Sequence, residues 1–212
     1  MSVLVTTGPT REYLDPVRFL SNPSSGKMGI AIAGEALRLG AKVTLISGPT
    51  SLTQTVSKKI KLIQVITAEG MYRAVMKKFP RADLIFMVAA VSDWRPANFS
   101  SKKLKIKKRW PLPLVPTPDI LATVGRKKKK GQLLIGFAAE TNNLVLNARA
   151  KMKKKNCDLM IANKVGSKNV GFESDHSRGY LLSKDSVVPF PLLSKQKLAR
   201  KILKVFSKPF SN

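Results

Sequence analysis

A continuous apolar segment, residues 84–91, is the feature that most restricts the fold of this chain. It reads Leu-Ile-Phe-Met-Val-Ala-Ala-Val and offers no polar position to solvent. A strand with one solvated face alternates apolar and polar residues, whereas a parallel strand covered by helices on both faces is apolar throughout. The segment therefore predicts a central strand of a parallel sheet with helices on both sides.

Other segments alternate between strand and helix patterns, as a parallel sheet requires. Glycine or proline follows several of them and marks their ends. We expect further strands at residues 3–7, 42–46, 60–66, 133–137 and 158–162. We expect helices at residues 29–39, 69–78, 119–124, 142–155 and 193–206. The remaining elements are a long loop at 10–25, a hairpin-like flap at about 98–116 and a late β-hairpin at 180–182 and 187–189. Residues 1–212 are expected to form one α/β domain with a Rossmann-like, doubly wound, mostly parallel sheet.

The charge of the chain limits the classes of partner. Lys and Arg number 39 against 12 Asp and Glu, which gives a net charge of +27, and the basic residues are dense in residues 102–155. Such a field attracts phosphates, nucleic acid or anionic lipid, but a solvated lysine-rich surface has the same composition. Few aromatic residues lie among these lysines, so the pattern gives little support to nucleic-acid binding.

Cysteine and histidine are scarce, with only Cys157 and His176 in the chain. This excludes a disulfide framework, a cysteine zinc cluster and a multi-histidine metal site. We expect Cys157 in the core and His176 in a loop. The sequence has no run of about 18 apolar residues and no signal-peptide pattern at its start, so a cytoplasmic protein without a membrane partner is expected.

Ligands of open α/β sheets bind beyond the carboxyl ends of the strands. Residues 8–10, 47–49, 89–94 and 136–140 are expected to meet there. The dinucleotide fingerprint G-x-G-x-x-G is absent after the first strand, which argues against an NAD(P)-dependent reductase. Residues 24–29 read Ser-Ser-Gly-Lys-Met-Gly and lack the Ser/Thr that ends a phosphate loop, so they are either an anion site at a helix N-terminus or an ordinary helix start.

Asp93 and a pair of lysines each have two interpretations. Asp93 follows the apolar strand and either binds a metal, a ribose or a base amine, or caps a turn. On a helix that turns about 100° per residue, Lys151 and Lys155 fall within about 20° of Leu144 and so lie on the inward side. They either clamp nucleotide phosphates or extend to the edge of the apolar stripe.

Several long blocks of the sequence resemble one family. The blocks are residues 7–12, 14–22, 24–29, 89–97, 115–121, 136–141, 161–163 and 171–172, together with Lys151 and Lys155. Over nearly its whole length the chain is similar to phosphopantothenate–cysteine ligase (phosphopantothenoylcysteine synthetase), a coenzyme A biosynthesis domain often fused behind a flavin-dependent decarboxylase. The sequence begins at the first strand of the ligase, so a stand-alone ligase is expected.

The resemblance implies a two-step reaction. The carboxylate of 4'-phosphopantothenate attacks the α-phosphate of CTP, which gives an acyl-cytidylate and pyrophosphate, and the amine of L-cysteine then displaces CMP to form the amide. Mg²⁺ and lysines would neutralise the phosphates, although the metal ligands stay unidentified. The resemblance also implies a homodimer, and a separate flavin-dependent decarboxylase is a candidate partner. The alternatives are an NAD(P)-dependent reductase and a basic nucleic-acid-binding protein.

The resemblance also assigns residues to the site. Asn22 would contact the acyl-cytidylate, with Arg18 close to it. Residues expected around the nucleotide are Ala89, Ala90, Asp93, Pro118, Asp119, Ile120, Leu121, Phe137, Lys151 and Lys155. The family has a catalytic lysine at the start of a K-x-K-K block in the flap. Its spacing from Asp93 favours Lys103, whereas the full K-x-K-K match begins at Lys105, so both are candidates and Lys103 is preferred.

Overall fold

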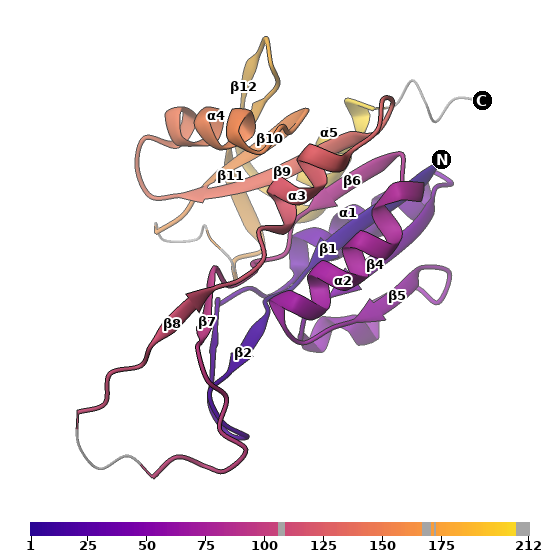
Figure 1. The fold of residues 1–212 in the computed structure, drawn as a ribbon. Helices are drawn as coiled ribbons and strands as arrows, with labels where there is room; N and C mark the ends of the chain where they lie inside the picture. The colour runs from indigo at the N-terminus through magenta and orange to yellow at the C-terminus, as the bar shows by residue number, and fades with distance from the viewer. Residues whose placement is uncertain (106–108, 167–170, 172, 207–212) are drawn as a thin grey trace.

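The structure is a computed structural model that describes residues 1–105, 109–166, 171 and 173–206. Its centre is an eight-stranded sheet in the order β12-β11-β10-β9-β6-β1-β4-β5 (Figure 1). The parallel strands are β1 (Ser2–Thr7), β4 (Lys42–Ser47), β5 (Lys61–Gln64), β6 (Leu84–Met87), β9 (Leu133–Glu140) and β10 (Leu159–Lys164). A hairpin continues the sheet: β11 (His176–Leu182) pairs antiparallel with β10, and β12 (Val187–Ser194) pairs antiparallel with β11. The predicted mostly parallel sheet and late hairpin are confirmed.

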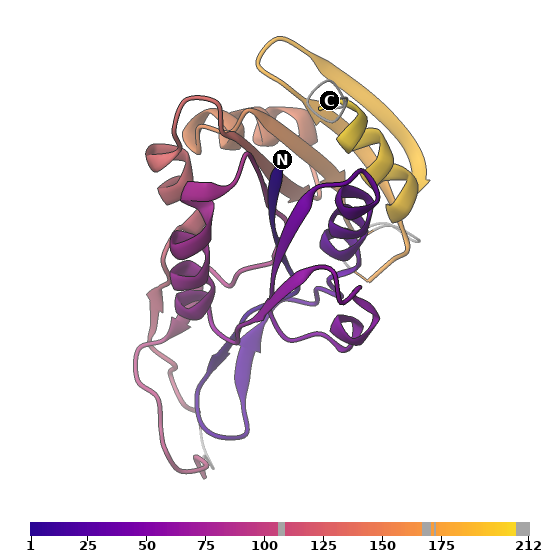
Figure 2. The same cartoon turned by 90° about the vertical axis from the view of Figure 1, so that its right-hand side faces the viewer.

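Helices cover both faces of this sheet, as Figure 2 shows from the side. One face carries α1 (Lys27–Arg38) and α5 (Lys195–Lys204). The other face carries α2 (Ala68–Lys78), α3 (Ile120–Lys127) and α4 (Leu144–Lys154). Short 3-10 turns lie at Ser51–Thr55 and Phe79–Arg81. In β6, Leu84 and Phe86 pack into the α1–α5 layer, whereas Ile85 and Met87 pack into the other. This double burial explains why the segment is apolar at every position.

The predicted strand 84–91 is too long, because β6 ends at Met87. The next two amides, of Val88 and Ala89, donate hydrogen bonds to Thr6 Oγ1 at 3.1 and 3.2 Å. A side-chain acceptor thus replaces the next rung of the sheet, and beyond this interruption Ala90 pairs with Pro9 in an isolated parallel bridge. His176 is likewise the first residue of β11 rather than a loop residue, whereas Cys157 lies in the core as predicted.

An arm projects from the carboxyl edge of the sheet (Figure 1). It contains two antiparallel pairs, β2 (Arg11–Tyr13) with β3 (Phe19–Ser21), and β7 (Trp94–Pro96) with β8 (Leu114–Pro116). The second pair is the base of the predicted flap, which starts at Trp94 rather than at about residue 98. The first pair is a correction, because a loop was predicted at 10–25.

A buried carboxylate joins the two halves of the arm. Asp15 is fully buried and accepts hydrogen bonds from the amides of Val17 and Arg18, from the Arg18 guanidinium at 2.6 and 3.0 Å, and from the amide of Leu104 in the flap at 3.1 Å. Burial raises the pKa of Asp15, but these donors outweigh it and hold the pKa well below its ordinary value. The flap is therefore fixed to the β2–β3 turn at Leu104.

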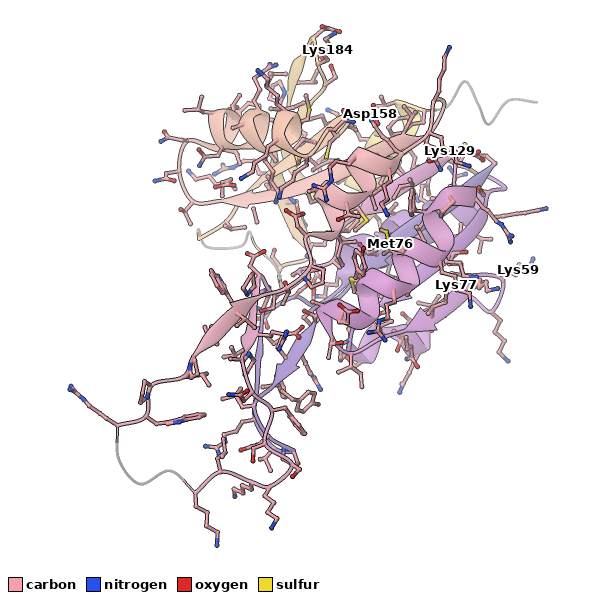
Figure 3. The ribbon with its side chains drawn as sticks, viewed as in Figure 1. Lys59, Met76, Lys77, Lys129, Asp158 and Lys184 are labelled. Carbon is pink, nitrogen blue, oxygen red and sulfur yellow. The ribbon has the colours of Figure 1, made fainter. Side chains whose placement is uncertain are left out.

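Much of the positive charge lies on the solvated surface. Lys59, Lys77, Lys129 and Lys184 are exposed and project from the side of the molecule opposite the arm (Figure 3). Within the part of the chain that the structure describes, no helix is long and apolar enough to cross a membrane.

We predict that Gly48→Ala destabilises the fold. Gly48 follows β4, donates its amide to the carbonyl of Thr7, and would place a Cβ only 1.6 Å from the carbonyl oxygen of Pro9. Relieving such an overlap should cost at least about 1–3 kcal/mol of unfolding free energy, measured by urea denaturation. The control is Gly34→Ala, since Gly34 lies in α1 with nothing near its Cβ position and should gain about 0.5–1 kcal/mol. Equal stability of Gly48→Ala and the parent would contradict this packing.

Candidate functional site

A cavity of about 610 Å³ opens at the carboxyl edge of the sheet. The segment after β6 and the end of β9 line it as expected. The ends of β1, β10 and α4, the start of β11 and the first turns of α1, α3 and α5 also contribute. The predicted residues on its wall are Asn22, Ala89, Ala90, Asp93, Pro118, Asp119, Ile120, Leu121, Phe137, Lys151 and Lys155. Residues 8–10 and 47–49 are not on this wall. They pack against one another beside it, at the contact between Gly48 and Pro9.

Asn22 links the loop before α1 to the loop after β6. Its Nδ2 donates to the carbonyls of Ala90 and Val91, at 3.2 Å each. The resemblance implied that this amide donates to the ligand, whereas here its donors are directed to the loop. The same loop is held at a second point, where the amide of Ser92 donates to Thr10 Oγ1 at 3.0 Å. Asn22 therefore positions the loop that carries Asp93.

The start of α1 closes tightly over the end of β1. Gly26 caps the helix with a left-handed φ of 78°, and its carbonyl accepts a 2.7 Å hydrogen bond from Thr7 Oγ1. A Cβ at Gly29 would lie 2.4 Å from the same hydroxyl. The glycines of residues 24–29 thus allow close contact between helix and strand. The first turn of α1 contains no acidic residue, so its positive end faces the cavity uncompensated by that turn.

The two lysines predicted as a clamp line the cavity together. Lys151 Nζ donates to the carbonyl of Phe137 at 2.9 Å, and burial lowers the pKa of Lys151 despite the opposing charges of Glu140 and Asp93. Lys155, the C-cap directly after α4, forms an ion pair with Asp119. The inward placement of both lysines is therefore confirmed, while their contact with phosphates stays a prediction.

Asp119 also caps α3, since its side chain accepts the Ala122 amide at 2.9 Å. Burial raises the pKa of Asp119, but hydrogen bonds from Lys155 and Ala122 produce a net lowering. Asp119 is therefore charged at neutral pH and fixes Lys155 at the rim of the cavity.

The candidate residues of the arm do not line the cavity. Arg18 binds Asp15 and donates to the carbonyl of Leu104 at 2.6 Å. Lys103 and Lys105 flank Leu104 and are exposed. Two parts of the predicted blocks lie outside the described residues: residues 106–108 of the K-x-K-K block, and Phe172 of the 171–172 block. The structure does not bring either lysine to the cavity, so their role stays a prediction.

Two cavity residues, Ser177 and Lys195, were not among the residues expected at the site. Lys27 and Asn163 also line the cavity, and they belong to the blocks 24–29 and 161–163, which had been given no residue-level role. Asn163 Oδ1 is the one buried side-chain polar atom of the described residues that lacks a hydrogen-bond partner, and such an acceptor favours a ligand that donates to it. Lys195 directly follows the helix cap Ser194. Its position at the start of the predicted helix 193–206 was the sequence signal that could have placed Lys195 near a site, but that helix was given no role at the site.

Burial raises the pKa of the Cys157 thiol to about 12. The thiol is therefore protonated at neutral pH and poorly suited to act as a nucleophile.

Comparisons with known proteins place the chain in a family. Residues 1–209 match the family described as DNA/pantothenate metabolism flavoprotein C-terminal domain. The chain is 43% identical over 206 residues to the coenzyme A biosynthesis bifunctional protein CoaBC of Vibrio vulnificus, a match that covers 96% of this chain and 51% of that relative. The chain thus spans about half the length of such relatives.

Solved structures agree with the sequence relatives. The C-terminal domain of a coenzyme A biosynthesis bifunctional protein CoaBC superposes with a TM-score of 0.81 at 39% identity, covering 98% of this chain and 94% of that domain. A Cab2 mutant in complex with phosphopantothenate-cysteine superposes with a TM-score of 0.75 at 17% identity, covering 98% and 86%, and shares the fold. The resemblance seen in the sequence is confirmed at the level of the family. The chain therefore belongs to the DNA/pantothenate metabolism flavoprotein C-terminal domain family.

Proposed function

We propose that the chain joins 4'-phosphopantothenate and L-cysteine through an acyl-cytidylate formed from CTP. The observation that carries this proposal is the shared cavity wall. It brings together Asn22, Asp93 and Phe137, which come from three separate blocks of the resemblance, and its lysine pair, Lys151 and Lys155. The coenzyme A biosynthesis names of the relatives support the same pathway.

The chemistry requires an activated carboxylate, because an amine cannot displace the oxygen of a carboxylate ion. Lys151 and Lys155 supply cations to a nucleotide, and Phe137 offers an apolar surface beside them. Asn22 holds the loop of residues 89–91 at the cavity wall, and this loop can keep the reacting carboxylate near the α-phosphate. Holding two reactants in such a geometry is itself a large part of catalysis.

Magnesium would enter this site with the nucleotide. Among residues 1–105, 109–166, 171 and 173–206, no group of three His, Cys, Asp or Glu side chains could hold a metal. Mg²⁺ commonly binds one or two carboxylates, substrate phosphates and water rather than an all-protein cage. Asp93, at the cavity wall, fits such a partial role. The ion would supply charge neutralisation on the phosphates.

The proposed assembly is a homodimer built through the arm. Several large apolar side chains of the arm are exposed: Val17, Phe19, Trp94, Phe99, Trp110 and Leu114. Exposed apolar patches of this kind commonly mark protein interfaces. We place the protein in the cytoplasm, where CTP is available, as a single domain over residues 1–212. A separate flavin-dependent decarboxylase would supply the later step on the product.

The first prediction from the proposed function concerns the reaction itself. With 4'-phosphopantothenate, L-cysteine and Mg²⁺, the protein should release pyrophosphate and form the amide, and CTP should support this better than ATP. The measurement is a coupled pyrophosphate assay with mass spectrometry of the product. Pyrophosphate release with neither nucleotide would exclude the proposal. Reduction of a substrate by a nicotinamide cofactor would favour the alternative reductase.

The second prediction concerns Asn22. Asn22→Ala should lower kcat about 100-fold or more, because the loop that orients the reacting groups loses its anchor. Asn98→Ala is the matched control, since Asn98 is exposed on the arm and should leave kcat unchanged. Unchanged kcat in Asn22→Ala would refute this role. Steeply salt-dependent nucleic-acid binding that persists in Asn22→Ala, without ligase activity, would favour the nucleic-acid alternative.

The third prediction separates the two flap lysines. We expect Lys103→Gln to slow product formation at least about 100-fold and Lys105→Gln to have a much smaller effect, because the spacing from Asp93 favours Lys103. Single-turnover kinetics with preformed acyl-cytidylate measure the step. The reverse order would assign the role to Lys105, and two small effects would remove the flap lysines from the mechanism.

A further inference from the structure

A second hollow, a groove of about 410 Å³, lies at the base of the arm. Its walls come from the strands β2 and β3, the loop before α1, the residue Pro49 that follows β4 by two positions, and Glu173. Asn22 and Ser24 line both this groove and the large cavity. The groove therefore borders the cavity, and a molecule held in it lies next to the proposed reaction site.

Arg11 is the cation of the groove. It is the first residue of β2, and its amide donates to the carbonyl of Ile66 at 2.8 Å, so its backbone is fixed. Its guanidinium lies over the ring of Phe19, with Cζ 4.6 Å from the ring centre. Stacking occupies the flat face of a guanidinium and leaves the N–H groups at its edge free for a planar acceptor such as a carboxylate. Among the described residues, no carboxylate forms an ion pair with Arg11.

Glu173 is the anion of the groove. Lys27 donates to the backbone carbonyl of Glu173 at 3.0 Å and pairs with Asp175 at 2.6 Å. These two contacts attach the segment 173–175 to the start of α1 and so fix this wall of the groove. Glu173 is exposed, and within the part of the chain that the structure describes its carboxylate pairs with no lysine or arginine.

The groove thus offers one charge of each sign. Arg11 and Glu173 are the only charged residues among the described residues that line it. A phosphate or another simple anion would meet the carboxylate of Glu173, and a simple cation would meet Arg11. A zwitterion satisfies both groups, because it carries a carboxylate and an ammonium on one small frame. Three prolines stiffen the backbone around the two charges: Pro9, Pro23 and Pro49.

We propose that this groove binds an α-amino acid as its zwitterion, with Arg11 on the carboxylate and Glu173 on the ammonium. The inference rests on the proposed function, in which the amino acid is L-cysteine. The nucleotide and 4'-phosphopantothenate are both anionic and suit the lysines of the cavity, whereas the amino acid carries no net charge. The shared wall at Asn22 and Ser24 leads from the groove to the cavity in which the acyl-cytidylate would form.

The test isolates the step that uses the amino acid. Single-turnover kinetics with preformed acyl-cytidylate give the half-saturating concentration of L-cysteine and the maximal rate. Arg11→Met and Glu173→Gln should each raise the half-saturating concentration about tenfold, as expected for a lost hydrogen bond between charged groups, and leave the maximal rate nearly unchanged. The matched controls are Arg73→Met and Glu69→Gln, an exposed ion pair of 2.7 Å within α2, which should change neither quantity by more than about twofold.

Analogues that lack one charge identify the partner of each residue. Cysteamine has no carboxylate, so it should require a higher concentration than L-cysteine in the parent, and Arg11→Met should add little to that increase. The loss caused by Glu173→Gln should persist with cysteamine. 3-Mercaptopropionate has no amine, so it should inhibit competitively and depend on Arg11 but not on Glu173. An equal loss for L-cysteine and cysteamine in Arg11→Met would indicate a distorted groove and overturn the assignment.

Two other results also overturn the inference. One is an unchanged half-saturating concentration of L-cysteine in both Arg11→Met and Glu173→Gln. The other is a lower maximal rate without a change in that concentration. Arg11→Lys replaces the methionine variant if that variant does not fold, and it should cause a smaller loss because lysine keeps the charge but lacks the planar fork. Glu173→Gln changes an exposed side chain without altering its size and remains informative in either case.

The two proposals can fail separately. Pyrophosphate release in the absence of L-cysteine reports the first step, and both groove variants should retain it. Normal pyrophosphate release and amide formation in variants that respond to L-cysteine like the parent would remove the groove and leave the ligase. If the parent releases no pyrophosphate, isothermal titration calorimetry with L-cysteine tests the groove alone. Binding that depends on Arg11 and Glu173 would then leave the amino-acid site standing, and no binding would remove it.

Discussion

The site depends on how the chain leaves the central strand β6. A parallel strand ends with backbone amides that need acceptors, and Thr6 Oγ1 on the neighbouring β1 accepts two of them, from Val88 and Ala89. This exchange interrupts the ladder at Val88 and Ala89, after which Ala90 forms an isolated parallel bridge with Pro9 and the chain continues along the cavity wall. Asn22 and Thr10 then hold the same loop from the β1 side. The position of Asp93 follows from these hydrogen bonds.

The electrostatics of the cavity differ from those of the outer surface. Exposed lysines such as Lys59 and Lys129 are solvated, and their charge contributes little to any one contact. Lys151 and Lys195 have lowered pKa values because burial disfavours their charged forms. Such lysines are poised to gain charge stabilisation from an anionic ligand. The buried part of the large positive charge at the cavity is therefore a small number of side chains.

Much of the fold was predictable because apolar periodicity directly reflects burial. The segment 84–91 correctly indicated helices on both faces, since Phe86 and Ile85 pack into opposite layers. The same segment misled at its end, because residues 88–91 are half-buried in the loop that lines the cavity rather than in a strand. The β2–β3 pair was missed because strands of three residues leave too short a pattern. Lys195 was missed because a lysine at a helix start is usually solvated, and only the topology of β12 directs it to the cavity.

The bond between Asp15 and the amide of Leu104 has a consequence for the reach of the flap. Lys103 and Lys105 are each one residue from this attachment, so each Cα lies about 3.8 Å along the chain from a fixed point. A lysine that acts on a ligand must therefore reach it by rotation of its own long side chain and of a few torsion angles. The attachment at Leu104 therefore limits how far either lysine can move. Loss of the Asp15 carboxylate would release this attachment and widen the range of positions of both lysines, although neither lysine is changed.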